Sequence, residues 1–313
     1  MLADVGGTEH RFGWIDSPGA GISRLVSHSG SAALGEEIGR YLSAQQLPRP
    51  ASASLGIAAP VLGDFVTMTN GDARFSIRAL KRELGVQTLL VMNDFAALAH
   101  SLPLLRDDES RPVGGGAATA GGALALVGPG TGLGVSGLLS VPGSHVPVVG
   151  EGGHASIAAS DEREDEVLAV LRRRFGRVSA ERILSGPGIA NLHAALRQLS
   201  GLAAEELQPA QVTQRALDAS DPCCVEALDL FFAFLGAVAG DVALTFGARG
   251  GVYIGGGIVA RLGVAIDRSR FRERFEEKGR YRPYLAGIPT RVLVDASSLA
   301  LRGADAALSQ MAA

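Results

Sequence analysis

Cysteine is almost absent from this chain of 313 residues, and the two that it has, Cys223 and Cys224, are neighbours. Adjacent cysteines rarely form a disulfide with each other, and two neighbouring thiols do not have the ligand spacing of a zinc site. These observations exclude a fold that depends on disulfides. The simplest interpretation is a protein of a reducing compartment, so we expect it to be cytoplasmic.

An excess of basic charge is also missing, because the formal net charge is −3. This net charge does not indicate the strongly basic surface that is typical of nucleic-acid-binding proteins. The first four residues lack the basic and apolar segments of a signal peptide, and Gly and Pro interrupt the uncharged stretch between Arg111 and Glu151. We therefore expect no nucleic acid and no membrane among the partners.

Glycine, by contrast, is abundant, and three glycine clusters each follow a strand-like run. These clusters are Asp4-Val5-Gly6-Gly7-Thr8, Gly128-Pro129-Gly130-Thr131-Gly132-Leu133-Gly134 and Gly255-Gly256-Gly257. Glycine lets the backbone approach a polyphosphate and direct its N–H groups toward it. The first two clusters each hold a threonine, which favours two turns that bind one nucleotide. Tight glycine turns are also common without any ligand, so a single one is weak evidence.

Strand-like and helix-like segments alternate along the chain, and this alternation predicts an α/β protein. We expect strands over 1–5, 11–15, 54–58, 65–68, 88–92, 123–127, 251–254 and 291–295. We expect helices over 34–47, 76–85, 95–105, 160–175, 179–184, 221–246 and 298–311. Ser76 and Ser160 are the predicted N-caps of their helices, and residues 107–122 read as an exposed loop.

Seven motifs, in order and with matching spacing, resemble those of the bacterial glucokinases of the hexokinase-like superfamily. They are Asp4–Thr8, Met68-Thr69-Asn70, Asn93-Asp94-Phe95, Gly128–Gly134, Gly150-Glu151-Gly152-Gly153-His154, Ala180–Gly188 and Gly250–Ile258. The resemblance implies the two-lobed actin-like (ribonuclease H-like) ATPase fold, with the active site in the interdomain cleft. It implies a small α/β domain over 1–104 plus 297–313, a large α/β domain over 105–296, and a homodimer.

The resemblance further implies ATP-dependent phosphorylation of glucose at its 6-hydroxyl, with Asp94 as the general base. Such a reaction needs a carboxylate that accepts the hydroxyl proton, groups that hold the sugar, and a phosphate site with Mg²⁺. Asp94 ends a predicted strand, and its alternative role is the N-cap of the helix that follows.

Asn93, Asp94, Glu151, His154 and Glu181 resemble the family's sugar-binding residues. Several directional donors and acceptors suit a polyol, because each hydroxyl offers both. The alternatives are ordinary ones: Glu151 as a solvated loop carboxylate, His154 as a histidine without a role, and Glu181 as an acid in the first turn of a helix.

The remaining site residues resemble the family's nucleotide-binding set, for which ATP and Mg²⁺ are the expected cofactors. Asp4 is the expected partner of Mg²⁺, through water. The backbone around the three glycine clusters is expected to bind the nucleotide: Ala3, Asp4, Val5, Gly6, Gly7, Thr8, Gly130, Thr131, Gly132, Gly255 and Gly256. The alternatives are a turn aspartate for Asp4 and a close helix–strand crossing for Gly255 and Gly256.

The sequence departs from the family pattern at two places. Glu9 and His10 stand where the family has Asn and Ala, and an acid near phosphates weakens nucleotide binding unless a cation such as Arg11 pairs with it. The tryptophan that the family often has near Ala73 or Arg74 is missing. Two alternatives stay open on these grounds: a kinase of another hexose, and a non-catalytic sugar-binding sensor of the same fold.

Overall fold

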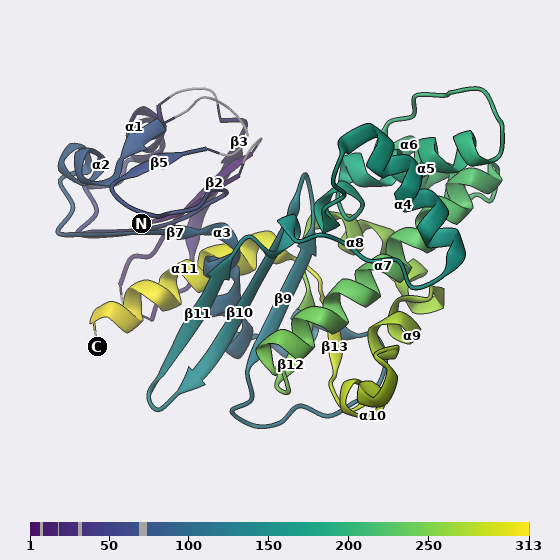
Figure 1. The fold of residues 1–313 in the computed structure, drawn as a ribbon. Helices are drawn as coiled ribbons and strands as arrows, with labels where there is room; N and C mark the ends of the chain where they lie inside the picture. Colours follow the sequence, from purple (N-terminus) through teal and green to yellow (C-terminus); the bar gives the residue numbers. More distant parts are fainter. Residues whose placement is uncertain (7–8, 18, 31–32, 69–73, 313) are drawn as a thin grey trace. The chain divides into compact units, whose positions relative to one another are not determined.

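The computed structural model describes residues 1–6, 9–17, 19–30, 33–68 and 74–312 (Figure 1). The described chain forms two compact units. Unit 1 comprises Met1–Leu105, Pro142–Val149 and Asp295–Ala313, and unit 2 comprises Arg106–Val141 and Gly150–Val294. Each unit combines a β-sheet with helices, so the predicted α/β class is confirmed.

The first sheet has five strands in the order β3-β2-β1-β4-β7. Their bounds are β1 Leu2–Val5, β2 His10–Trp14, β3 Ser23–His28, β4 Ser52–Ile57 and β7 Thr88–Asn93. The central strands β1, β4 and β7 run parallel, whereas β2 and β3 add an antiparallel edge. The carboxyl ends of three parallel strands therefore meet at one edge, where ligands usually bind in open α/β sheets.

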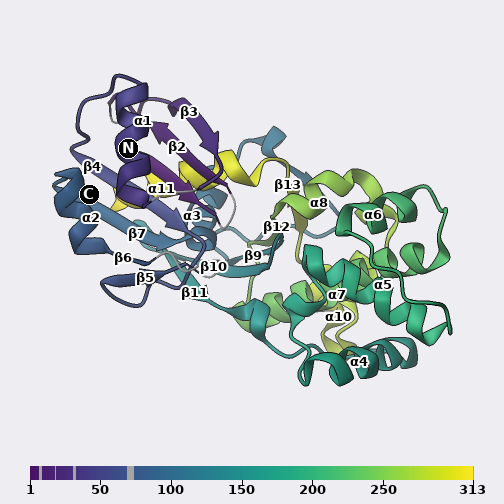
Figure 2. The ribbon, with the colours of Figure 1, turned by 90° about the horizontal axis from the view of Figure 1, so that it is seen from above.

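Helices cover both faces of this sheet (Figure 2). Their bounds are α1 Leu34–Ala44, α2 Ile77–Leu84, α3 Asp94–Ser101 and α11 Ala296–Ala312. Ala3 and Leu55 point to a core that includes Ile38 of α1 and Leu80 of α2. Leu2 points to the opposite face, where it packs with residues of α3 and α11. Because side chains alternate along a strand, Asp4 shares the α3 face with Leu2.

A small antiparallel hairpin of β5, Phe65–Thr67, and β6, Arg74–Ser76, precedes α2. The predicted N-cap of α2 is confirmed. Ser76 accepts a hydrogen bond from the Ala79 N–H, and Gly85 ends the helix in the left-handed conformation with φ 67°. Glycine adopts this conformation at no steric cost, so the helix ends where the sequence predicts.

The second sheet has six strands in the order β11-β10-β9-β12-β13-β8. Their bounds are β8 Ser110–Pro112, β9 Leu124–Pro129, β10 Leu133–Val141, β11 Ser144–Gly150, β12 Gly251–Ile254 and β13 Thr290–Leu293. Strands β9 and β10 form an antiparallel hairpin, whereas β12 runs parallel to both β9 and β13. The second and third glycine clusters follow β9 and β12, so they lie at the same edge of the sheet.

The helices of unit 2 surround a large apolar core (Figure 1). Their bounds are α4 Glu162–Phe175, α5 Gly186–Leu199, α6 Pro209–Leu217, α7 Pro222–Phe246, α8 Gly257–Leu262, α9 Phe271–Glu276 and α10 Arg282–Ala286. Short 3₁₀ turns lie at Leu102–Leu104, Asp107–Glu109, Gly152–His154, Ala180–Arg182, Gly263–Arg268 and Gly279–Tyr281.

Helix α7 is long and apolar enough to cross a membrane by length and composition, and 72% of its most apolar segment is buried within the structure. Phe231, Phe232 and Phe234 of α7 are among the largest fully buried side chains. Their burial is what the core helix of a globular domain requires, because a folded domain hides such a surface among its own side chains.

One predicted cap is wrong. The expected N-cap Ser160 lies one residue too early, because the Asp161 side chain accepts the hydrogen bond from the Glu164 N–H and α4 begins at Glu162. Both Ser and Asp are good N-caps, so the choice between neighbours depends on the path of the preceding chain. The predicted loop over 107–122 contains the short strand β8, which pairs with β13.

Candidate active site

Asp4 and Asp94 lie at the same edge of the first sheet. The register pairs Val5 with Ile57 and Ile57 with Asn93, so β1, β4 and β7 end level with one another. Gly56 allows this arrangement, because a Cβ there would meet the Ala97 Cβ at 3.0 Å and the Asp94 Cα at 3.5 Å. The missing side chain therefore lets the start of α3 lie directly on β4.

The N-cap of α3 is Asn93 and not Asp94. The Asn93 Oδ1 accepts hydrogen bonds from the N–H groups of Phe95 at 2.9 Å and Ala96 at 3.2 Å. Asp94 is the first residue of the helix, and its Oδ1 also accepts from the Phe95 N–H at 2.9 Å. The alternative role of Asp94 as the N-cap is thus wrong, because Asn93 occupies that position.

Burial and charge together raise the pKa of Asp4 to about 6. The largest cause is the loss of water around the carboxylate, and the second is repulsion from Asp94. Arg11 opposes both effects, because its Nη1 lies 3.3 Å from Asp4 Oδ2. Two carboxylates that repel each other at a strand edge make a region that a divalent cation would stabilise. The residues present therefore fit Mg²⁺.

Arg11 also holds Glu9, the acid that departs from the family pattern. Its Nη2 donates to Glu9 Oε2 at 2.5 Å. The register of the β1–β2 hairpin places Arg11 opposite Asp4, and the Gly6 N–H donates to the Glu9 carbonyl at 3.0 Å to close the turn. Sequence reasoning named Arg11 only as a conditional partner of Glu9, and it missed the contact with Asp4. The register of the β1–β2 hairpin, which pairs Arg11 with Asp4, is the feature that could have revealed this contact.

The second glycine cluster forms a tight turn between β9 and β10 in unit 2. The Gly130 N–H donates to the Gly132 carbonyl at 2.8 Å, and the Gly186 N–H donates to the Gly130 carbonyl at 2.9 Å. The Leu133 N–H donates to Glu181 Oε2 at 3.0 Å. The turn is therefore fixed from outside by the start of α5 and by a carboxylate, while Thr131 remains exposed.

Glu181 also lies next to His154. Its Oε1 is 4.0 Å from His154 Nδ1, and about half of the histidine side chain is exposed. Glu151 is exposed at the start of the same 3₁₀ turn, whose backbone closes with a hydrogen bond from the His154 N–H to the Glu151 carbonyl at 3.0 Å. The structure thus brings Glu151, His154 and Glu181 together within unit 2.

The loop that carries Glu151 and His154 lies against the phosphate turn. A Cβ at Gly153 would meet the Leu133 carbonyl oxygen at 2.1 Å, and one at Gly152 would meet the Val135 side chain at 2.9 Å. The two glycines of this motif are therefore needed for close packing on β10. Close packing therefore accounts for both glycines. It also places the Glu151 carboxylate and the His154 imidazole beside the turn.

The third glycine cluster lies beside the second one. The Gly255 N–H donates to the Val127 carbonyl at 2.9 Å, and Gly256 has φ 77°. A Cβ at Gly256 would meet the Pro129 carbonyl oxygen at 2.2 Å. The close helix–strand crossing considered above as an alternative is therefore present, because the start of α8 lies against β9. The role of Gly255 and Gly256 in nucleotide binding stays a prediction.

Several predicted residues contribute only backbone or lie outside the described residues. Ala3 and Val5 are buried, with side chains in the core of unit 1, so only their backbone can face a ligand. Gly7 and Thr8 lie outside the described residues, as do Thr69, Asn70 and Ala73. Their assignments stay predictions.

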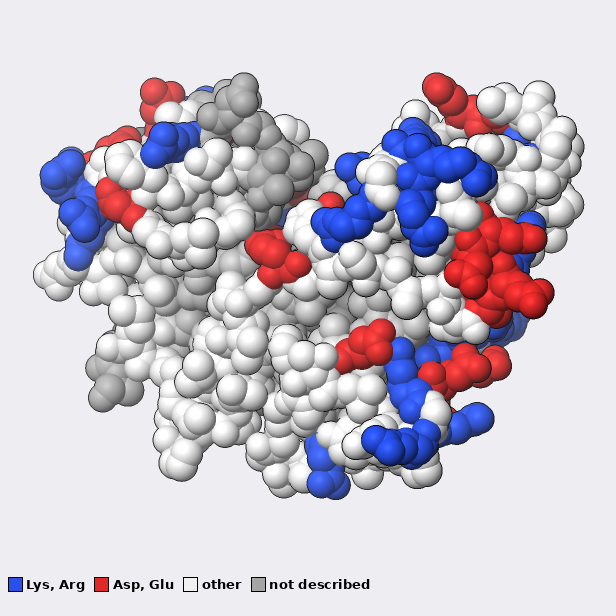
Figure 3. Space-filling view, viewed as in Figure 1, with Lys and Arg blue, Asp and Glu red and all other residues white. Residues whose placement is uncertain are grey.

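Charge is unevenly distributed on the face of unit 2 that Figure 3 shows, where basic and acidic side chains gather in separate patches over the helices. Helix α4 accounts for part of this separation. Its first turn holds Glu162, Glu164 and Asp165, whereas its last turn holds Arg172, Arg173 and Arg174. Each charge is placed favourably in the field of the helix dipole.

Comparison with known proteins gives the same assignment over nearly the whole chain. The sequence profile described as Glucokinase matches residues 1–311. A curated glucokinase of Aromatoleum aromaticum is 52% identical over 98% of this chain and 94% of its own length. That of Chromobacterium violaceum is 48% identical over 95% of this chain and 85% of its own length.

Solved structures agree with the sequence relatives. A glucokinase from an Antarctic psychrotroph aligns with a TM-score of 0.88 and 34% identity, over 98% of each chain. A ROK family glucokinase of Streptomyces griseus, solved with glucose and AMPPNP, aligns with a TM-score of 0.66 and 18% identity over 97% of this chain and 96% of that one. The second likeness shows the fold alone, and it confirms the predicted two-lobed actin-like sugar-kinase fold. With the profile match and identities near one half, the chain belongs to the glucokinase family.

Proposed function

We propose that this chain transfers the γ-phosphoryl group of ATP to the 6-hydroxyl of glucose, with Asp94 as the general base. The observation that carries the proposal is the cap of α3. Asn93 caps the helix, so capping does not account for the carboxylate next to it at the strand edge. A carboxylate in this place accepts the proton that the sugar hydroxyl loses as its oxygen attacks phosphorus.

Three side chains of unit 2 are proposed to bind the sugar. Glu151, His154 and Glu181 form one cluster of acceptors and donors, and such a set suits adjacent hydroxyls. Asn93 is proposed as a further sugar ligand through its amide. Its Oδ1 already accepts two backbone hydrogen bonds, so its remaining capacity lies mainly in Nδ2, which is 3.5 Å from the Ala59 carbonyl.

The nucleotide is proposed to lie along the glycine clusters, with Asp4 as the protein group nearest to Mg²⁺. When bound, Mg²⁺ would neutralise phosphate charge and relieve the repulsion between Asp4 and Asp94. The chain itself supplies the backbone of Gly6, Gly130, Thr131 and Gly132, whose turns can direct N–H groups toward phosphate oxygens. Gly255 and Gly256 are proposed to border the adenosine.

A coupled assay with glucose and Mg·ATP tests this proposal on three proteins: the unaltered chain, Asp94→Asn and Asp16→Asn. Loss of a general base typically lowers kcat by about 10²–10⁴-fold, and Asn93 still caps the helix in the Asp94 variant. Asp16 is an exposed carboxylate after β2, so its variant is a matched control that should keep full activity. Near-normal kcat in Asp94→Asn would refute the assignment of the base.

We also propose that the chain forms a homodimer and is cytoplasmic. The first rests on the family resemblance, and sedimentation at several concentrations tests it. The second is supported by two buried cysteines that are free thiols. A reducing compartment keeps such thiols unmodified.

A further inference from the structure

A second cluster of metal-binding side chains lies inside unit 2, formed by residues that are far apart in the sequence. His193 lies on α5, Asp221 is the N-cap of α7, and Cys224 lies in the first turn of α7. Their ligand atoms all lie within 4.8 Å of one another. The two helices pack against each other, so their contact holds the three side chains together.

The imidazole of His193 has an unused polar atom. The side chain is 1% exposed, and its Nε2 has no hydrogen-bond partner among the described residues. A buried polar atom without a partner costs free energy, so such an atom needs an explanation. Nε2 points toward Asp221, with 3.9 Å between it and Oδ2. An ion bound here would give Nε2 the partner that it lacks.

We propose that His193, Asp221 and Cys224 form a binding site for a divalent transition-metal ion, with zinc as the best match. Imidazole nitrogen, carboxylate oxygen and thiolate sulfur are the ligands that zinc prefers, and three protein ligands leave a fourth position for water. Zinc bonds of about 2.0–2.3 Å require ligand atoms about 3.3–3.8 Å apart. The present cluster would therefore contract by about 1 Å when the ion binds.

The surrounding charges allow the ion to bind. Arg197 and Arg215 each place a nitrogen 3.8 Å from Asp221 Oδ2, and both guanidinium groups also pair with Glu205. The two cations are thus balanced by two carboxylates before any metal binds. Burial keeps the His193 imidazole neutral by lowering its pKa, so a ring nitrogen can donate a lone pair to the metal.

Metal binding at this site releases a proton. Burial, and then the neighbouring Asp221, raise the pKa of the Cys224 thiol to about 11. At neutral pH the thiol is therefore protonated, and the S–H bond breaks as the sulfur–metal bond forms, with the proton passing to the solvent.

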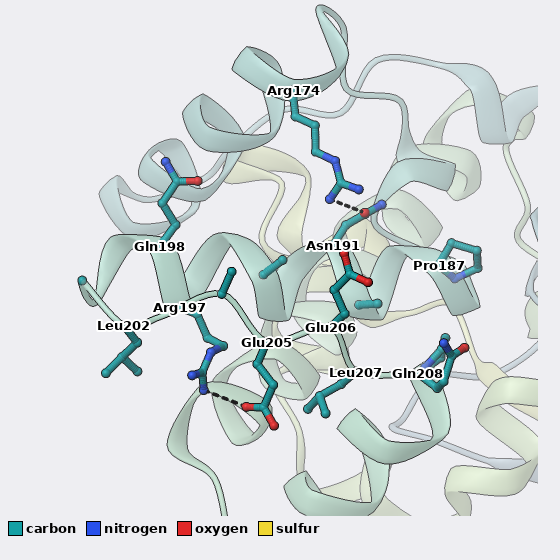
Figure 4. A pocket seen from close by; sticks show the side chains of 15 residues that line it. Arg174, Pro187, Asn191, Arg197, Gln198, Leu202, Glu205, Glu206, Leu207 and Gln208 are labelled. Atoms are coloured by element: carbon teal, nitrogen blue, oxygen red, sulfur yellow. Dashed lines mark hydrogen bonds and ion pairs between the residues drawn. The ribbon is translucent and has the colours of Figure 1, made fainter.

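A neighbouring pocket shares the residue Arg197 with the surroundings of the cluster. Figure 4 shows Arg197 and Glu205 side by side on the wall of this pocket, joined as an ion pair, and the pocket has a volume of 920 Å³. Arg197 of this pair also lies 3.8 Å from Asp221 Oδ2.

The test uses the full chain, stripped with a chelator and then titrated with Co²⁺ as a spectroscopic substitute for zinc. We expect a thiolate-to-cobalt charge-transfer absorption at about one ion per chain, which zinc then displaces. Cys224→Ser should abolish this band, and His193→Gln should weaken metal binding by about 100-fold or more. Cys223→Ser is the matched control, because it removes the adjacent buried thiol and should keep the band.

Three results would overturn the proposal: no charge-transfer band in the unaltered chain, a band that survives in Cys224→Ser, or a band that is lost only in Cys223→Ser. Circular dichroism of each variant shows whether it folds. If Cys224→Ser does not fold, the metal affinity of His193→Gln, which keeps the thiol, tests the proposal instead. Unchanged affinity in that variant would overturn it. Because the readout is the cobalt–thiolate band, the outcome does not depend on the proposed kinase activity.

Discussion

Arg11 connects Glu9 to Asp4, because its guanidinium donates to Glu9 at 2.5 Å and lies 3.3 Å from Asp4. The acid that departs from the family pattern is thus neutralised by the cation that also approaches the proposed magnesium partner. Glu9 and Asp4 share one counter-charge, so a change at any of the three residues alters the field at the other two.

Glu9→Asn is expected to leave the KM for Mg·ATP nearly unchanged. The sequence alone predicts a lower KM, because a carboxylate about 8 Å from phosphate costs about 2 kcal/mol per unit charge at an effective dielectric of about 20. The ion pair with Arg11 cancels most of that repulsion. Initial-rate kinetics with ATP varied check this, and a several-fold lower KM would show that the pair does not persist in solution.

Asp4→Asn is expected to make the protein more stable at neutral pH while it lowers activity. The carboxyl releases its proton at about pH 6 when folded, against an ordinary value of 3.8. Between these values the folded chain holds the extra proton, so the free energy of unfolding falls as the pH rises through this range. Above about pH 6 the ionised carboxylate lowers the free energy of unfolding by about 3 kcal/mol, because each unit of difference in pKa corresponds to about 1.36 kcal/mol.

We therefore expect urea unfolding to give a gain of about 1–3 kcal/mol for Asp4→Asn near pH 7, and almost none near pH 4, in the absence of ligands. The weakened contact with Arg11 reduces the gain below its full value. If the free energy of unfolding rises equally at both pH values, the stabilisation does not come from removal of the buried charge.

Glu181→Ala is expected to raise the KM for glucose and the KM for Mg·ATP, whereas Glu151→Gln and His154→Ala should raise mainly the KM for glucose. Glu181 alone of the three accepts the Leu133 N–H next to the phosphate turn, so its loss affects both proposed sites. Kinetics and calorimetry with each substrate separate these effects. If glucose affinity is unchanged in the Glu151 and His154 variants, the sugar-binding assignment of this loop is wrong.

Gly303→Ala is expected to destabilise the protein by about 1–3 kcal/mol or more, because added volume in a tightly packed contact forces the backbone apart. A Cβ there would lie 1.8 Å from the Ala97 carbonyl oxygen, at the contact between α11 and α3. Gly39→Ala is the matched control. It lies exposed on α1 with nothing near its Cβ position, and alanine should stabilise that helix by up to about 1 kcal/mol. Similar unfolding midpoints for both variants would contradict this packing.

Much of the fold could be predicted from local sequence. The strand over 251–254 and the long helix that follows Asp221 match the structure closely, because an apolar run ending in glycine and a cap followed by proline are strong local signals. The elements that were not predicted include strands β3, β8 and β11 and helices α5, α6, α8, α9 and α10. The helix expected over 179–184 is wrong: only a 3₁₀ turn lies there, and Ser185 caps the start of α5. Exposed residues alternate irregularly in β3, and α9 and α10 are too short to show a period.

The site was harder to derive, because its relationships are between residues that only the fold brings together. The sequence offers no sign that Glu181 accepts the Leu133 N–H, 48 positions away. Nor does it show that Asn93 rather than Asp94 caps α3, since both residue types cap helices well. The role of Arg11 follows from the hairpin register, which the sequence does suggest through the glycine turn.

Leu133 is held from two sides, by Glu181 at its N–H and by the close approach of Gly153 at its carbonyl. A single peptide segment thus belongs both to the turn proposed for phosphate and to the loop proposed for the sugar. If one ligand shifts that segment, the binding site of the other ligand changes as well. By thermodynamic reciprocity, whatever factor glucose imposes on the dissociation constant of the nucleotide is the factor that the nucleotide imposes on that of glucose.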